Sequence, residues 1–171
     1  HTCVIITGGT MKCWGLGTRG QLGDGGTSSS TPVSVNRSGV SSVTAIAATK
    51  YATCAIVVAS KVKCWGGDSA NEMGYDTGNP SPNTYPTDLT GLFTTQTPVT
   101  PQLGGTDITA KAIDGGPRGV CVVSLTNSLA CWGSIYGMGI STSGTNFGAA
   151  FTSAWVSGMT SVTNVGIGGA A

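Results

Sequence analysis

The sequence predicts an all-β chain made of three consecutive propeller-type blades. A Cys-Trp-Gly tripeptide occurs three times, and another cysteine lies ten positions before the cysteine of each copy. The repeats begin at Cys3, Cys54 and Cys121, and a period of roughly 50 to 70 residues is close to that of propellers, solenoids or arrays of one unit. No segment has a sustained helical period of apolar residues, and short β-prone runs alternate with turn residues. Such short strands fit propeller blades better than a sandwich.

The chain is expected to form one repeat domain. Its units are placed at residues 1–50, 51–117 and 118–171. Each unit opens with two β-prone runs separated by three residues, which predicts a hairpin with a three-residue loop. That loop type requires a left-handed backbone conformation at its third residue. The three units have Gly9, Ser60 and Asn127 at this position.

The cysteines are expected to pair across these hairpins. Directly opposed residues in an antiparallel pair have Cα atoms ~4.5–5.5 Å apart, which a disulfide can bridge. The predicted disulfides are Cys3–Cys13, Cys54–Cys64 and Cys121–Cys131. They indicate an oxidising compartment, such as the cell exterior, the cell surface or the periplasm. Zinc is the alternative, but the cysteines lack C-x2-C spacing and the single histidine is His1, so no metal is expected.

Two further elements follow each hairpin. The first is a tight turn around one apolar side chain that we expect to be buried: Leu22, Met73 or Met138. The second is a small-residue strand that closes the unit, at residues 43–47, 108–113 and 162–167. Alanine and glycine allow a neighbouring sheet to approach closely, as an inner propeller strand requires.

The composition excludes several classes of function. Only 9% of the residues are charged, against ~25% in a typical soluble domain, and the formal net charge is +1. Without a run of Lys or Arg, the chain lacks the electrostatic footprint of a nucleic-acid binder. No apolar run approaches the ~18 residues that span a bilayer. The absence of an initiator Met and of a signal-peptide core indicates a processed or excised piece.

Five submotifs follow one another in the first unit. They lie at residues 1–5 (HTCVI), 12–15 (KCWG), 20–25 (GQLGDG), 31–33 (TPV) and 43–47 (VTAIA). In this order they resemble the repeat of the regulator of chromosome condensation, in its cysteine-containing bacterial and extracellular variety. The second unit keeps the opening, the Cys-Trp-Gly corner and Thr-Pro-Val, whereas the third is degenerate.

This resemblance implies a β-propeller, usually of seven blades, in proteins that bind other proteins. Some members are nucleotide-exchange factors or chromatin binders, and others inhibit β-lactamases. The matching residues are framework residues of the repeat, so none of those functional surfaces is transferred to this chain. Three units also cannot close a seven-bladed ring.

No catalytic or cofactor-binding residue is predicted. His1 could hold copper only with a second histidine, which the chain lacks, and a structural role is favoured. The scattered acidic residues are best explained as turn formers, although two could meet as a glycosidase pair. They are Asp24, Asp68, Glu72, Asp76, Asp88, Asp107 and Asp114. The corner tryptophans Trp14, Trp65 and Trp132 are interpreted as blade-packing residues rather than a carbohydrate platform, and Trp155 departs from the pattern.

One insertion is a candidate recognition loop. It covers residues 75–96 of the second unit and is rich in Pro, Asn and Thr. Its large apolar and aromatic residues are Tyr75, Tyr85, Leu92 and Phe93. Long loops on a rigid scaffold often bind partners, but simple tolerance of an insertion explains the segment equally well.

The predicted function is that of an extracellular structural or interaction scaffold, such as an adhesin or an assembling fibre subunit, rather than an enzyme. The alternative is a secreted carbohydrate-binding or carbohydrate-active propeller. An exchange factor for a small GTPase conflicts with the expected disulfides. Expected partners are other proteins or further copies of the chain, and a glycan stays open. The two ends should present complementary unpaired strand edges, covered either by blades of a longer chain or by another copy.

Overall fold

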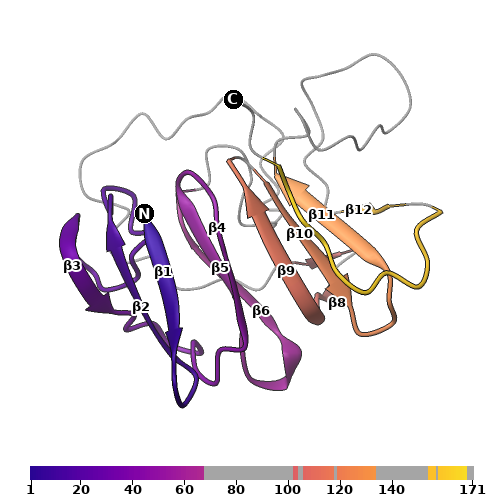
Figure 1. The fold of residues 1–171 in the computed structure, drawn as a ribbon, viewed down its shortest axis with the longest axis horizontal. Coiled ribbons are helices and arrows are strands. Elements are labelled where there is room, and N and C mark those ends of the chain that lie inside the picture. Colours follow the sequence, from indigo (N-terminus) through magenta and orange to yellow (C-terminus); the bar gives the residue numbers. More distant parts are fainter. Residues whose placement is uncertain (68–101, 104–105, 118, 134–153, 157, 169–171) are drawn as a thin grey trace.

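The computed structural model describes residues 1–67, 102–103, 106–117, 119–133, 154–156 and 158–168. These residues form three antiparallel sheets that follow one another in chain order (Figure 1), which confirms the predicted all-β blade architecture. Among the described residues, no helix is long and apolar enough to cross a membrane.

The first two sheets have three strands each. The first sheet has the order β1-β2-β3, and its strands are β1 (Thr2–Ile6), β2 (Thr10–Gly15) and β3 (Ser29–Ser34). The second sheet has the order β4-β5-β6, and its strands are β4 (Ala45–Ala48), β5 (Ala52–Ile56) and β6 (Val62–Gly66). A 3-10 turn, η1 (Val58–Ser60), joins β5 to β6.

The third sheet is four-stranded, with the order β12-β11-β10-β9. Its strands are β9 (Ala110–Gly116), β10 (Gly119–Ser124), β11 (Leu129–Gly133) and β12 (Ala154–Trp155). A two-stranded ribbon of β7 (Gln102–Leu103) and β8 (Thr106–Asp107) precedes it.

The three hairpins have the predicted geometry. In each, the two cysteines are direct partners across the strands, with Cα atoms 4.1 Å apart, and are joined by a disulfide. The third loop residue is left-handed in every hairpin: φ is 74° at Gly9, 59° at Ser60 and 64° at Asn127. The predicted pairings Cys3–Cys13, Cys54–Cys64 and Cys121–Cys131 are thus confirmed.

Each small-residue strand pairs with the strand that follows it in the chain. Ala47 of β4 lies opposite Cys54 of β5, and Asp114 of β9 lies opposite Cys121 of β10. These strands therefore begin the sheet of the following unit, although the sequence places them at the end of the preceding one. The reason is local, because Thr49 Oγ1 accepts hydrogen bonds from the amides of Tyr51 and Ala52 in the tight link between β4 and β5.

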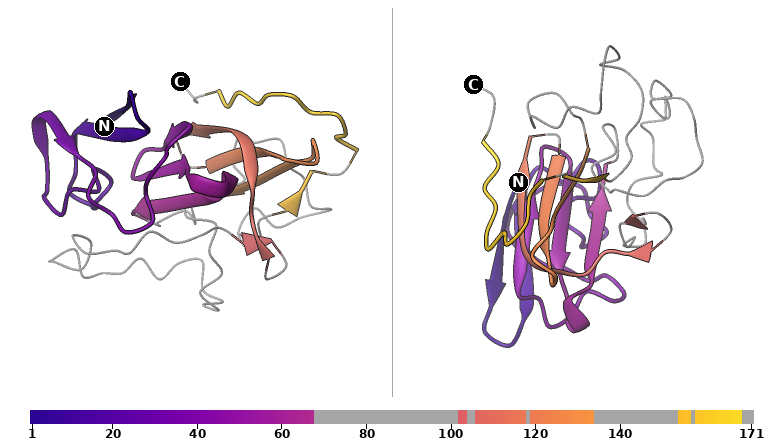
Figure 2. Two further views of the ribbon diagram at one scale, coloured as in Figure 1. Left: turned by 90° about the horizontal axis from the view of Figure 1, so that it is seen from below. Right: turned by 90° about the vertical axis from the view of Figure 1, so that its right-hand side faces the viewer.

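Two apolar clusters hold the sheets together, and Figure 2 shows the sheets in sequence. The first lies between the first and second sheets and contains Met11, Cys13, Leu22, Val43, Ala55, Val57 and Trp65. The second lies between the second and third sheets, where Cys54, Ile56 and Val62 meet Val120, Val122 and Trp132. Because strand residues alternate between faces, Ala55 faces the first sheet whereas Cys54 and Ile56 face the third. Each sheet is thus packed on its neighbour by side chains of both.

Candidate functional site

A polar junction connects the first two sheets inside the apolar cluster. Gln21 follows Gly20 in the predicted tight turn and is fully buried. Its backbone oxygen accepts hydrogen bonds from Trp65 Nε1 at 3.1 Å and from Thr53 Oγ1 at 2.8 Å. A side chain at Gly23 would come within 2.8 Å of Trp65 Nε1, so the turn needs glycine there. The turn of one unit therefore docks the tryptophan of the next.

His1 belongs to the same junction. Its Nε2 lies 2.7 Å from Thr53 Oγ1. The single hydroxyl hydrogen of Thr53 is donated to the Gln21 carbonyl, so His1 Nε2 must be the donor to Thr53. Two buried atoms here, His1 Nδ1 and Gln21 Nε2, have no hydrogen-bond partner among the described protein atoms. His1 thus ties the start of the first sheet to the second, as its predicted structural role requires.

The corner tryptophans differ in burial. Trp65 is fully buried and Trp132 is 2% exposed, which confirms their predicted packing role. Trp14, in the first sheet, is only half-buried. Trp65 packs on the preceding sheet, whereas no described sheet precedes the one that carries Trp14.

The described carboxylates have structural partners. Asp24 Oδ1 accepts from the amide of Gly26, and Asp114 Oδ2 accepts from the amide of Ile167. Asp107 lies 3.8 Å from Lys61 Nζ in an exposed ion pair. No group of three or more His, Cys, Asp or Glu within the described ranges is arranged to hold a metal ion. The acidic residues Asp68, Glu72, Asp76 and Asp88 lie outside those ranges.

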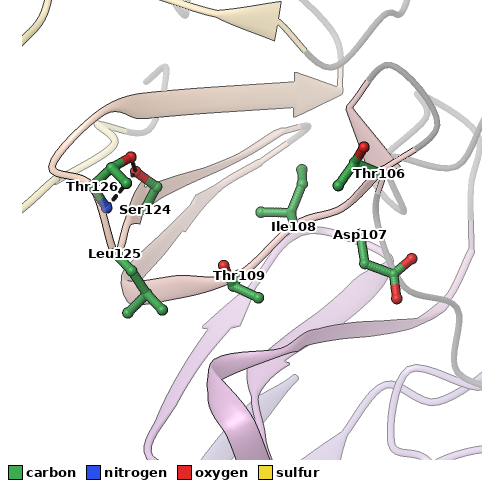
Figure 3. A pocket seen from close by; sticks show the side chains of 7 residues that line it. All are labelled: Thr106, Asp107, Ile108, Thr109, Ser124, Leu125 and Thr126. Carbon is green, nitrogen blue, oxygen red and sulfur yellow. Dashed lines mark hydrogen bonds between the residues drawn. The ribbon is translucent and has the colours of Figure 1, made fainter.

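A shallow pocket of about 350 Å³ lies between β8, the link from β8 to β9 and the turn after β10 (Figure 3). It is lined by Thr106, Asp107, Ile108, Thr109, Ser124, Leu125 and Thr126. Three of its polar side chains, Asp107, Ser124 and Thr126, have partners in the chain. The Ser124 hydroxyl lies 2.9 Å from Thr126 Oγ1 and accepts from two backbone amides, while Asp107 pairs with Lys61. The Ser124 hydroxyl contacts Thr126 and Asp107 pairs with Lys61, so these described contacts do not pair a nucleophile with a base.

The most unusual surface is the outer edge of β1, which pairs with β2 and with no other described strand. Val4, Ile5 and Ile6 are 40%, 38% and 37% exposed. Their counterparts after the first cysteine of β5, namely Ala55, Ile56 and Val57, are 0%, 2% and 3% exposed. The counterparts in β10, namely Val122, Val123 and Ser124, are also buried. Both β5 and β10 are flanked by two strands, so this exposure accompanies the lack of an inner neighbour.

Residues 162–168 form a second unusual element, near the other end of the described chain. They have the small-residue pattern of β4 but belong to no described strand. The amide of Val162 donates to the Asn127 carbonyl, and a side chain at Gly116 of β9 would meet Ile167 Cγ2 at 2.5 Å. Gly115 is packed in the same manner on Ala47 and Ala48 of β4. In Figures 1 and 2 this yellow segment crosses the third sheet beside β9.

The structure does not test the predicted recognition loop. Tyr75, Tyr85, Leu92 and Phe93 lie outside the described residues, as do Met73 and Met138 of the expected turns. Leu22, the third residue of that kind, is fully buried as predicted. Sequence reasoning missed the Gln21–Thr53–His1 junction, although the Gly-Gln-Leu-Gly run marked one of its members.

Comparisons with known proteins agree with this fold. Residues 9–56 match the regulator of chromosome condensation (RCC1) repeat. No curated protein sequence matches the chain. Human WBSCR16 superposes with a TM-score of 0.62 at 18% identity, over 90% of this chain and 34% of its own. Prp20p from Saccharomyces cerevisiae gives 0.65 at 17% identity, over 90% of this chain and 35% of its own.

Yeast RCC1 (Prp20) in a complex with Kap60 gives a TM-score of 0.64 at 16% identity, over 93% of this chain and 36% of its own. The chain therefore spans about a third of the length of these solved structures. At such identities the likeness shows the fold alone. This chain carries an RCC1 repeat and folds as consecutive blades of an RCC1-like propeller.

Proposed function

We propose that this chain is a non-catalytic protein-interaction scaffold made of disulfide-linked RCC1-type blades, and that it works outside the reducing cytosol. The observation that carries the proposal is a contrast in burial. The motif residues are buried between the sheets, whereas apolar side chains of β1 are exposed. The motif residues Gln21, Thr53 and Trp65 are used in packing between sheets. The exposed apolar residues Val4, Ile5 and Ile6 lie along the edge of β1. A rigid scaffold with such an edge is suited to binding another polypeptide.

The comparisons with solved structures support the general class of protein-binding scaffolds. The structure of Prp20p was described together with its binding to Gsp1p and histones, and the yeast protein was also solved bound to Kap60. Proteins with this blade fold thus bind other proteins. We do not transfer those partners, since this chain has no basic run and its described cysteines all form disulfides.

The disulfides support the proposed location outside the reducing cytosol. Each of the three closes a short hairpin, and the described chain has no free cysteine. Disulfides of this density persist in secreted and surface proteins and are rare in the cytosol. We therefore place the scaffold at the cell exterior, the cell surface or the periplasm, as an adhesin or fibre subunit. The insertion at residues 75–96 would supply contacts specific to one partner, with Tyr75, Tyr85 and Phe93 as its aromatic groups.

Native material provides the test. Thiols should be blocked with N-ethylmaleimide before the cells are opened, and surface proteins should then be cross-linked and mapped by mass spectrometry. We expect six disulfide-bonded cysteines and cross-links from this chain to protein. Alkylated thiols in native material would contradict the compartment. Binding on a glycan array or hydrolysis of a polysaccharide, without cross-links to protein, would favour a secreted carbohydrate-active propeller instead.

A further inference from the structure

We propose that Arg19, Lys50 and Tyr51 form a binding site for a carboxylate group on an acidic segment of the partner protein. The inference rests on the proposed scaffold function and names the chemistry that the scaffold recognises. It starts from a cluster that joins the first unit to the second. Arg19 Cζ lies 4.3 Å from the centre of the Tyr51 ring, and Lys50 Nζ lies 5.0 Å from the same centre.

The two positive charges at this ring are not balanced by the described part of the chain. A cation is attracted to the face of an aromatic ring, but the ring leaves the charge in place. Among the described residues, neither Arg19 nor Lys50 forms an ion pair. The described carboxylates Asp24, Asp107 and Asp114 have structural partners elsewhere. Two like charges held at one ring repel each other, and a bound carboxylate would relieve that repulsion.

The Arg19 side chain is held in place by its surroundings. Its backbone amide donates to Oε1 of the fully buried Gln21 at 2.9 Å. A side chain at Gly67 would come within 2.7 Å of Arg19 Cδ and within 3.1 Å of Tyr51 Cβ. The arginine stem and the tyrosine therefore lie against the backbone of Gly67. Because this stem is already packed, ligand binding would cost it less conformational entropy than a freely rotating side chain would lose.

The link between β4 and β5 holds the other two residues. The amide of Lys50 donates to the Pro117 carbonyl at 3.0 Å, and the amide of Tyr51 donates to Thr49 Oγ1 at 3.3 Å. Lys50 is exposed, whereas Arg19 and Tyr51 are half-buried. The Tyr51 hydroxyl makes no hydrogen bond with the described residues. The cluster thus offers a guanidinium, an ammonium and a hydroxyl as hydrogen-bond donors.

These donors favour a carboxylate of a polypeptide. A guanidinium presents parallel N–H groups that match the two oxygens of a carboxylate, and an ammonium adds a charge-assisted hydrogen bond. Sulfated polysaccharides and anionic membranes attract runs or larger clusters of Lys and Arg, which this chain lacks. Two cations at one ring instead suit one or two acidic side chains of a protein.

Titration of the disulfide-intact 171-residue chain with a capped hexaglutamate peptide at low salt tests the site, with binding followed by amide NMR shifts. Arg19→Gln and Lys50→Gln each remove one charge of the cluster. Lys111→Gln is the matched control, because Lys111 lies near the start of β9, whereas Lys50 contacts Pro117 beyond its other end. Circular dichroism and disulfide mapping would verify that each variant is folded. A heparin fragment is the comparison ligand.

We expect the peptide to shift the amides of Arg19, Lys50 and Tyr51. Arg19→Gln and Lys50→Gln should each weaken binding by about threefold, and Lys111→Gln should bind like the parent. The absence of peptide binding would overturn the proposal, and so would equal binding by all variants. Binding of the heparin fragment without binding of the peptide would also overturn it, in favour of a sulfated glycan.

Native material separates this inference from the proposed function. A carbodiimide joins a lysine amine directly to a carboxylate in contact with it, so we expect a cross-link from Lys50 to an acidic residue of another protein. A cross-link from Lys50 to a carboxylate of its own chain, such as that of Asp68, would overturn the proposal. Cross-links to another protein that never involve Lys50 would refute this inference while supporting the scaffold function.

Discussion

Ile5 and Ile56 occupy the same position in two successive hairpins, yet Ile5 is 38% exposed and Ile56 is 2% exposed. Each lies two residues after the first cysteine of its hairpin. The strand of Ile56 is flanked on both sides, whereas the strand of Ile5 is flanked on one side. The same repeat position is therefore a core residue in one sheet and a surface residue in the other.

This difference predicts unequal effects of the same substitution. Ile56→Ala should lower the free energy of unfolding by about 2–4 kcal/mol, because it opens a cavity in the second apolar cluster. Ile5→Ala in dilute solution should cost less than about 1 kcal/mol, because water already reaches the side chain. Urea unfolding measures both values. Equal losses would show that β1 is as well covered as β5.

The hydrogen bond from Trp65 to Gln21 predicts that Trp65 contributes more to stability than Trp14 does. Trp65→Phe removes the donor to the Gln21 carbonyl and leaves a small cavity, so it should cost about 2–3 kcal/mol. Trp14→Phe should cost less than about 1 kcal/mol, since Trp14 is only half-buried. Thermal and urea unfolding followed by circular dichroism provide the comparison. A larger loss for Trp14→Phe would contradict the assigned role of the junction.

Alanine substitutions at Gly66 and Gly8 distinguish the cost of a steric contact from the cost of backbone strain. Both have positive φ, at 111° and 92°, so each Ala variant should bear a conformational cost of about 1–2 kcal/mol. At Gly66 a side chain would also meet the Tyr51 carbonyl oxygen at 2.5 Å, whereas nothing lies within 4 Å at Gly8. Gly66→Ala should therefore be less stable than Gly8→Ala by about 1–3 kcal/mol. Equal unfolding midpoints would rule out the close contact.

The disulfides should stabilise the sheets individually. Replacing Cys54 and Cys64 together by Ala should lower the free energy of unfolding by about 2–3 kcal/mol from chain entropy, with a further loss from packing. The same double replacement of Cys3 and Cys13 should cost less, because Cys3 is only half-buried. Peptide mapping without reductant should recover the three hairpin pairs in the parent chain. Bonds between different hairpins would contradict the fold.

Sequence reasoning succeeded where structure is set locally. Cysteines at a fixed offset predicted the strand register, and the third loop residue predicted the left-handed backbone at Gly9, Ser60 and Asn127. Leu22 and Trp65 were also expected inside the protein. These features depend on a few neighbouring residues and on the alternation of a strand.

Features that join distant segments were not predictable in this way. The forward pairing of β4 was also missed, because the short link held by Thr49 Oγ1 carries no apolar signal. The junction of Gln21 with Thr53 joins residues from two units. The pocket beside Ser124 brings together a ribbon and a hairpin turn, and its residues carry no recognisable motif.

Amide hydrogen exchange at β1 tests the central claim most directly. Peptides covering residues 1–8 and 51–58 of the disulfide-intact chain should be compared by mass spectrometry. In dilute solution, the β1 peptide should exchange faster than the β5 peptide, because one side of β1 is unpaired. Equally slow exchange of the two peptides would contradict the difference in pairing between β1 and β5.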